Sequence, residues 1–140
     1  MPRTALTRRV TFAAAHRYRR PEWSAAKNFE VFGNCSREAW HGHTYTCDVS
    51  VSGPVDDVTG FVVDLRLLDE ILAREVMARF DHRNVNTDIP EFAEGRLVPT
   101  CENIAAFIAG RVQDALGTRS RVTRVQLSES PTLWAEWTAD

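Results

Sequence analysis

Apolar and polar side chains alternate along four segments of the chain, as they do in β-strands that bury one face. In the second segment, for example, Tyr45, Cys47, Val49 and Val51 fall on one face. The predicted strands cover Thr4–His16, His41–Gly53, Arg121–Glu129 and Leu133–Trp137. They therefore form two pairs, separated by the middle of the sequence.

Two segments between the strand pairs carry apolar residues at the helical spacing of three or four positions. The first begins after Asp64, a suitable N-cap, and ends near Arg79. The second begins after Thr100, another N-cap residue, and ends at Gly117, a typical helix stop. Their expected buried stripes are Leu65, Leu68, Leu72 and Val76 in the first, and Cys101, Ile104, Ile108, Val112 and Ala115 in the second.

The order of two strands, two helices and two strands indicates an α+β domain. We expect an antiparallel four-stranded sheet with both helices on one face. Arg17 to Trp40 and Asp88 to Pro99 are predicted as loops, and the first is long enough to suggest a functional role. Because 140 residues is the size of one domain, we assign residues 1–140 to a single domain.

Charge and cysteine content exclude several classes of protein. With 17 basic and 19 acidic residues the net charge is −2, which argues against a nucleic-acid binder that works by bulk charge. No stretch approaches the roughly 18 apolar residues of a membrane span. Three cysteines cannot form a closed disulfide set, and no signal-peptide pattern is visible, so we expect a cytoplasmic protein without a membrane partner.

Three of the four histidines lie at ends of the first two predicted strands. His41 and His43 are two residues apart, so their side chains point to the same side of the strand, and His16 ends the other strand. Three imidazoles with an open fourth position are the ligand set of a catalytic zinc site. The pattern therefore suggests a metal centre, although two histidines at this spacing also arise by chance on a polar strand.

Cys35 and the Asp81-His82 pair are candidates for proton transfer. A thiol near a metal or a charged imidazole has a lowered pKa and can act as a base. A carboxylate such as Asp81 can orient and charge a neighbouring imidazole, here His82. The alternatives are a small buried residue for Cys35 and a solvated helix end for the pair; Cys47 and Cys101 are expected to pack in the core.

Glu129 is an unexpected residue because it shares the predicted apolar face of its strand with Thr123, Val125 and Leu127. A buried carboxylate needs a partner, and a heterocycle edge with adjacent N–H donors would supply one. The alternative is a solvated position at a fraying strand end. Cations that follow His16 could meet a phosphate or simply be solvated: Arg17, Arg19, Arg20 and Lys27.

Together these segments resemble the 6-pyruvoyl-tetrahydropterin synthase family, which includes the 6-carboxytetrahydropterin synthases. The resemblance extends from about Val10 to Trp137, and its specificity lies in the order and spacing of the motifs. The matching motifs are FAAAHR (Phe12–Arg17), NFEVFGNC (Asn28–Cys35), HGHTY (His41–Tyr45), GFVVDL (Gly60–Leu65), FDHRNVN (Phe80–Asn86), PTCEN (Pro99–Asn103) and the glutamate of LSES (Leu127–Ser130).

The resemblance implies the tunnelling fold (T-fold), in which subunits join their sheets around a barrel, usually as trimers stacked into hexamers. It implies that Zn²⁺ is the cofactor and 7,8-dihydroneopterin triphosphate the substrate, converted with elimination of triphosphate. It also implies a role for each matching residue. Zinc would be held by His16, His41 and His43, the proton relay would be Cys35 with Asp81 and His82, the pterin anchor would be Glu129, and Thr100 and Glu102 would lie beside the pterin.

Some features leave the product and the activity open. Asn34 replaces the lysine that usually precedes the cysteine, and Arg37 or the arginines after His16 could compensate for the lost charge. The spacing from Cys35 to His41 resembles the biopterin-type enzymes and favours 6-pyruvoyl-tetrahydropterin as product. Cys35 also argues against a family branch that cleaves dihydroneopterin side chains and carries glutamate there. The alternatives are a 6-carboxytetrahydropterin synthase of queuosine or deazapurine biosynthesis and a non-catalytic pterin- or zinc-binding module.

Overall fold

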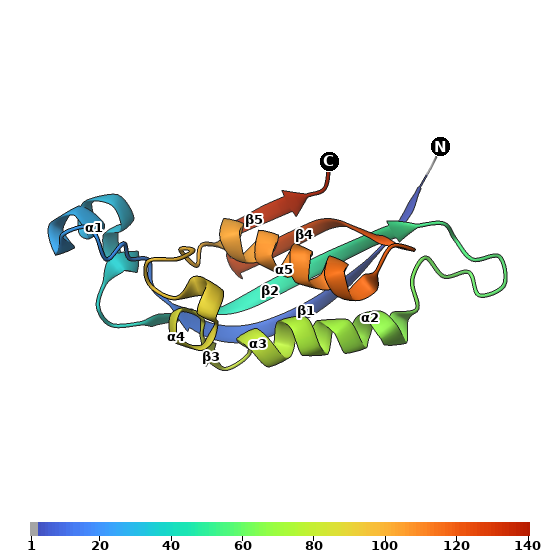
Figure 1. Cartoon of the computed structure of the whole chain (residues 1–140), viewed down its shortest axis with the longest axis horizontal. Helices are drawn as coiled ribbons and strands as arrows, with labels where there is room; N and C mark the ends of the chain where they lie inside the picture. Colours follow the sequence, from blue (N-terminus) through green and yellow to red (C-terminus); the bar gives the residue numbers. More distant parts are fainter. Residues whose placement is uncertain (1–2) are drawn as a thin grey trace.

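The computed structural model describes residues 3–140, which form one sheet with helices packed against it (Figure 1). Within these residues the sheet has five strands in the order β3-β1-β2-β4-β5. The four long strands agree with the alternation pattern to within one residue at each end, and they pair antiparallel. They are β1 (Thr4–His16), β2 (His41–Gly53), β4 (Arg121–Ser130) and β5 (Leu133–Thr138).

The fifth strand, β3 (Arg83–Asn84), was not predicted. It pairs in parallel with Ala14 and Ala15 of β1, on the edge of β1 that faces away from β2. Two residues are too few to show an alternating pattern, so the sequence holds no signal for it. This short strand matters for the site because it follows directly after Asp81 and His82.

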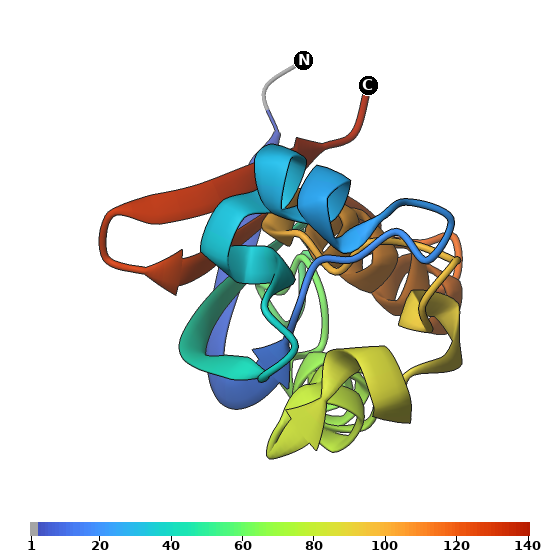
Figure 2. The ribbon, with the colours of Figure 1, turned by 90° about the vertical axis from the view of Figure 1, so that its left-hand side faces the viewer.

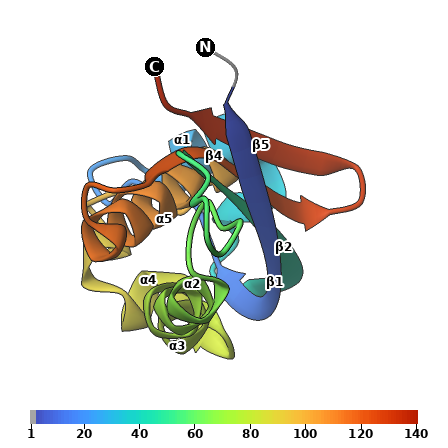
Figure 3. The same ribbon diagram turned by 90° about the vertical axis from the view of Figure 1, so that its right-hand side faces the viewer.

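Both predicted helices are present and lie on the same side of the sheet (Figure 3). The first comprises α2 (Leu65–Leu72), a π-helical turn η2 (Ala73–Met77) and α3 (Ala78–Phe80); the second is α5 (Cys101–Leu116). Asp64 and Thr100 cap them as predicted, since their side chains accept hydrogen bonds from the backbone N–H groups of Arg66 and Asn103. None of the helices in residues 3–140 has both the length and the apolar character that crossing a bilayer requires.

One position of the predicted helical stripe was wrong. Leu65 is 38% exposed at the start of α2. Ile71 is buried instead and packs with Leu68, Leu72 and Val76. The core between helices and sheet is built on stacked aromatic rings, among them Phe12 and Tyr45 with ring centroids 5.0 Å apart.

The predicted loop from Arg17 to Trp40 contains a helix, α1 (Ala25–Phe32), followed by a short 3-10 helix, η1 (Gly33–Ser36). These elements project from one end of the molecule, opposite the loop of residues 54–63 (Figures 1 and 2). Phe29 and Val31 are more than half exposed, so α1 has no apolar stripe that periodicity could detect. The second predicted loop likewise holds α4 (Val85–Asp88) and a 3-10 turn, η3 (Pro90–Phe92).

A buried ion-pair cluster stabilises the π-helical turn. Glu75 is 7% exposed and accepts hydrogen bonds from Arg111 Nε at 2.9 Å and from Arg74 Nε at 3.1 Å. Burial raises the pKa of Glu75, but these hydrogen bonds and the charges of Arg111 and Arg79 outweigh burial. The pKa of the carboxyl is therefore held below its ordinary value.

Replacing this carboxylate should destabilise the fold in a pH-dependent way. We expect Glu75→Gln to lower the free energy of unfolding by about 2 kcal/mol at neutral pH, because it removes charge-assisted hydrogen bonds and keeps the side-chain shape. Because the folded pKa is lowered, this contribution is present above the unfolded pKa of about 4.3 and is lost as the pH falls through the folded pKa. Urea denaturation of both proteins at neutral and at acidic pH measures the difference, and a difference that does not shrink in acid would contradict the assignment.

Candidate functional site

The three predicted metal ligands meet where β1 ends and β2 begins. The antiparallel register places His16 opposite His41 and Ala14 opposite His43. The centroids of the three imidazole rings are 4.6 to 5.2 Å apart, and one ring nitrogen of each histidine lies within 4.8 Å of the others. The sequence-predicted cluster is therefore formed by the pairing of two neighbouring strands.

The surroundings of these rings leave nitrogen lone pairs for a metal. His16 Nδ1 lies 2.9 Å from the carbonyl oxygen of Pro99, to which it donates, so that Nε2 remains available. Burial lowers the pKa of His16 to about 4, and burial followed by repulsion from His43 lowers the pKa of His41. Both rings are therefore neutral at pH 7, the form that binds metal.

The environment of His43 gives the strongest indication of a metal site. Its Nε2 is buried and has no hydrogen-bond partner among residues 3–140. Leaving a buried polar atom unpaired costs about 1–3 kcal/mol, so a native structure rarely keeps such an atom without a functional role. A cation coordinated jointly with His16 and His41 would provide one, and a set of three imidazoles fits zinc.

Glu129 lies next to this cluster. Its side chain is 10% exposed, and Oε2 is 3.9 Å from His43 Nε2 and 4.0 Å from His16 Nε2, too far for hydrogen bonds. Val125 and Leu127 are fully buried on the same strand, as predicted. The position is therefore the apolar face, and the solvated alternative for Glu129 does not hold.

The assignment of Thr123 to that face was wrong. A β-bulge between β2 and β4 shifts the register at Ser50 and Val51, so that Val122 instead of Thr123 occupies the buried position. Alternation in one strand cannot reveal such an extra residue, because a bulge is a property of the pair.

The sequence suggested only a packing role for Cys101, but its thiol also makes a polar contact in the site. Its side chain is buried, and its Sγ donates a hydrogen bond to Glu129 Oε2 at 3.6 Å. Burial, and then the charge of Glu129, raise the pKa of the thiol to about 12. Cys101 is therefore a neutral donor that holds one oxygen of the Glu129 carboxylate.

Cys35 lies in η1 and is partly exposed. The backbone N–H of Tyr18 donates to its carbonyl oxygen at 2.8 Å, which holds η1 against the segment that follows β1. Burial raises the pKa of the Cys35 thiol, and the charge of Glu129 raises it further. Within residues 3–140, the causes of this shift are burial and Glu129, and they include no cation.

Asp81 and His82 lie at the β3 edge of the sheet. Asp81 Oδ1 accepts a hydrogen bond from the Ala13 N–H at 3.0 Å, and its Oδ2 lies 3.1 Å from His82 Nδ1. The His82 side chain is 83% exposed, and its backbone φ of 59° is uncommon for a residue other than glycine. Within residues 3–140, no hydrogen bond or ion pair joins this pair to Cys35, so the single chain does not assemble the predicted relay.

Thr100 and Glu102 lie at the start of α5. The Thr100 hydroxyl is engaged as the helix cap, and Glu102 is exposed in the first turn. Burial raises the pKa of the Tyr18 phenol, and the charge of Glu102 is one of the electrostatic effects that raise it further. Glu102 therefore acts on the same phenol as Cys101 and Glu129, whereas the Thr100 hydroxyl caps α5.

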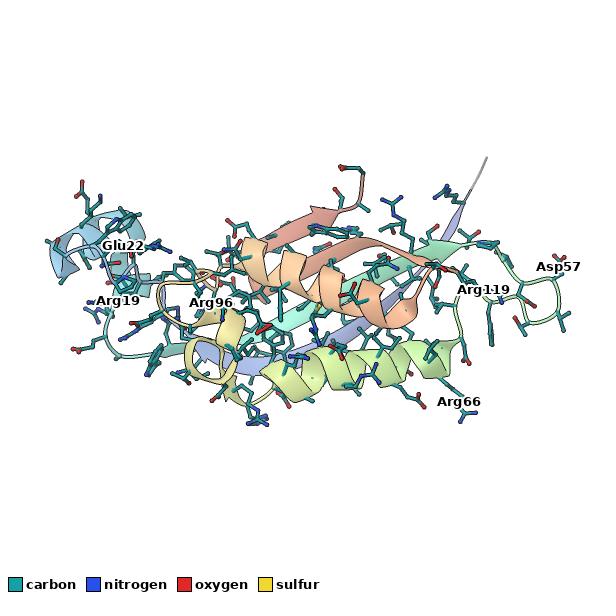
Figure 4. The ribbon with its side chains drawn as sticks, viewed as in Figure 1. Arg19, Glu22, Asp57, Arg66, Arg96 and Arg119 are labelled. Carbon is teal, nitrogen blue, oxygen red and sulfur yellow. The ribbon has the colours of Figure 1, made fainter. Side chains whose placement is uncertain are left out.

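Most of the cations after His16 are already paired. Arg17 contacts Glu94 and the Trp40 ring, Arg20 contacts Glu22, and the ammonium of Lys27 lies over the Trp23 ring. Arg19 has no ion pair within residues 3–140 and lies near α1 (Figure 4). Arg19 is thus the member of this group most available to a phosphate.

Comparisons with known proteins identify the relatives of this chain. A family model described as 6-pyruvoyl tetrahydropterin synthase matches residues 5–140. The chain is 38% identical over 130 residues to the 6-pyruvoyl tetrahydrobiopterin synthase of Drosophila melanogaster, covering 93% of this chain and 76% of that relative. It is 34% identical over 108 residues to the 6-carboxy-5,6,7,8-tetrahydropterin synthase of Bacillus subtilis, covering 74% and 69%. The solved structure of Caenorhabditis elegans 6-pyruvoyl tetrahydropterin synthase superposes with a TM-score of 0.91 at 31% identity, covering 100% of this chain and 98% of that one.

Proposed function

The chain belongs to the 6-pyruvoyl tetrahydropterin synthase family, a family of lyases, and from this we propose that it converts 7,8-dihydroneopterin triphosphate to 6-pyruvoyl-tetrahydropterin. The reaction eliminates triphosphate and rearranges protons within the substrate, so it needs no redox cofactor. The observation that carries the proposal is the buried, unpaired Nε2 of His43 next to the carboxylate of Glu129. This arrangement offers a metal position and a pterin anchor side by side.

His16, His41 and His43 would hold the zinc ion. A bound zinc acts as a Lewis acid toward oxygen atoms of the substrate side chain and lowers the cost of charge that develops there. The protein prepares the ligands for this role, because the Pro99 carbonyl fixes the tautomer of His16 and burial keeps that ring neutral.

Glu129 would bind the pterin ring through two adjacent N–H groups of its amino-pyrimidine edge. One of its oxygens already accepts a hydrogen bond from Cys101, yet a carboxylate has about four acceptor sites. The ligand would satisfy the remaining sites and remove the cost of a nearly buried charge. Because Glu129 lies about 4 Å from His16 and His43, this contact would bring the ring next to the proposed metal ligands.

Cys35 would take the proton from a carbon of the substrate side chain. In the single chain its pKa is raised, so the thiolate needs a partner that this chain does not supply. Asp81 and His82 form an exposed, oriented carboxylate–imidazole pair at the β3 edge. We place this pair in the site of an adjacent copy, where His82 would exchange a proton with Cys35.

An assembly of several copies follows from that arrangement. We propose the trimer or hexamer implied by the family resemblance, acting in the cytoplasm in tetrahydrobiopterin biosynthesis. Cys35, Cys47 and Cys101 are all free thiols, as expected of a reducing compartment.

A second candidate activity is 6-carboxytetrahydropterin synthesis for queuosine, favoured by the relationship to the Bacillus subtilis enzyme. Both candidates use the same substrate, so the product distinguishes them.

Incubation of the purified protein with 7,8-dihydroneopterin triphosphate should release triphosphate and yield 6-pyruvoyl-tetrahydropterin, identified by its mass. Addition of a chelator should stop the reaction. A carboxylated product would identify the second activity, and no release from protein with one zinc per chain would indicate a binding module without chemistry.

A further inference from the structure

Tyr18 is held rigidly beside the metal ligands, although no sequence pattern marked it. Its N–H is bonded to the Cys35 carbonyl, which ties it to the residue proposed as the base. Its ring meets the His16 ring edge-on, with centroids 5.0 Å apart and planes at 75°, and it meets the Phe32 ring at 5.9 Å and 70°. These contacts fix where the phenol group points.

The hydroxyl of Tyr18 has no hydrogen-bond partner among residues 3–140, and it is not among the fully buried polar atoms. The hydroxyl is therefore not fully enclosed by these residues, and its ring lies against His16. Burial raises the pKa of this phenol, and electrostatic repulsion from Glu129, Cys101, Cys35 and Glu102 raises it further. Buried tyrosines usually find a partner for the hydroxyl, so a half-buried phenol that lacks one is available to a ligand.

We propose that the Tyr18 hydroxyl donates a hydrogen bond to a hydroxyl oxygen of the substrate's C6 side chain and so selects pterins with a hydroxylated side chain. This inference rests on the pterin site proposed above. The zinc ion would attract oxygen atoms of the side chain, whereas Glu129 accepts N–H groups of the ring and Cys35 accepts a proton from carbon. None of these groups donates a hydrogen bond to the side-chain oxygens. A phenol is uncharged at neutral pH and would supply that donor.

Two ligands that differ only in the side chain test the inference. Wild-type and Tyr18→Phe proteins, both loaded with zinc, are titrated with 7,8-dihydroneopterin and with 6-methyl-7,8-dihydropterin by calorimetry. We expect Tyr18→Phe to weaken binding of dihydroneopterin about threefold to tenfold, the usual effect of one hydrogen bond, and to leave binding of the methyl compound unchanged. The variant keeps the ring contacts with His16 and Phe32, and its zinc content should equal that of the wild type.

Phe32→Leu is the matched control, because it disturbs the packing of the Tyr18 ring and keeps the hydroxyl. It should leave the ratio of the two affinities unchanged. Equal effects of Tyr18→Phe on both ligands, or no effect on either, would overturn the inference, as would wild-type protein that does not prefer dihydroneopterin. Triphosphate release by the wild type is measured separately. Release with an unchanged affinity ratio refutes only the role of Tyr18, whereas a selective loss without release refutes only the proposed activity.

Discussion

Cys35→Ala should abolish turnover of 7,8-dihydroneopterin triphosphate and leave the zinc content near one per chain. The thiol is the proposed base, and the other thiol of the site, Cys101, has a pKa raised to about 12 and is hydrogen-bonded to Glu129. General-base groups typically contribute about 10²–10⁴-fold to the rate, so the loss should be at least of that size. Triphosphate release and elemental analysis of the same preparation measure both quantities.

Cys47→Ala is the matched control for the loss of a thiol. Cys47 is fully buried in the sheet core, opposite Val10 and Leu127, and none of its hydrogen bonds or ion pairs within residues 3–140 involves Cys35 or Glu129. This variant should retain turnover, although it loses some packing. Full activity of Cys35→Ala would remove the thiol from the mechanism.

His43→Ala is expected to lose both zinc and activity. The substitution removes one of three ligands and takes away the buried Nε2 that has no other partner. Since changes to residues that only orient metal ligands cost about 10–100-fold in affinity, the loss of a direct ligand should exceed 100-fold. Competition with a chelator of known affinity measures the effect.

His82→Ala separates metal binding from proton transfer. His82 is exposed at the β3 edge and lies outside the histidine cluster, so the variant should keep its zinc and lose turnover.

For the His43→Ala prediction, a protein that still holds one zinc per chain with wild-type affinity would show that the metal is bound elsewhere.

The sequence predicted the parts of the fold that repeat a pattern over many residues. The long strands and the helices after Asp64 and Thr100 bury one face, and burial imposes a period that alternation or helical spacing reveals. Elements that lack a buried face escaped prediction. α1 exposes Phe29 and Val31, and β3 has only two residues.

The same distinction applies to the candidate site. The histidine cluster was predictable because strand pairing brings His16 opposite His41, and Glu129 stood out as a charge on an apolar face. The contact of Cys101 with Glu129 crosses between α5 and β4, which no local pattern encodes. Tyr18 lies in an irregular segment, where no periodic pattern predicts the position of a side chain. Its position depends on the hydrogen bond between its N–H and the carbonyl oxygen of Cys35 in η1.

X-ray absorption at the zinc edge of the purified protein tests most directly whether three imidazoles hold the metal with one position free. We predict three nitrogen ligands at about 2.0–2.1 Å and one light atom from water or substrate. A sulfur ligand at about 2.3 Å would contradict the account, because a cysteine bound to zinc could not serve as the base.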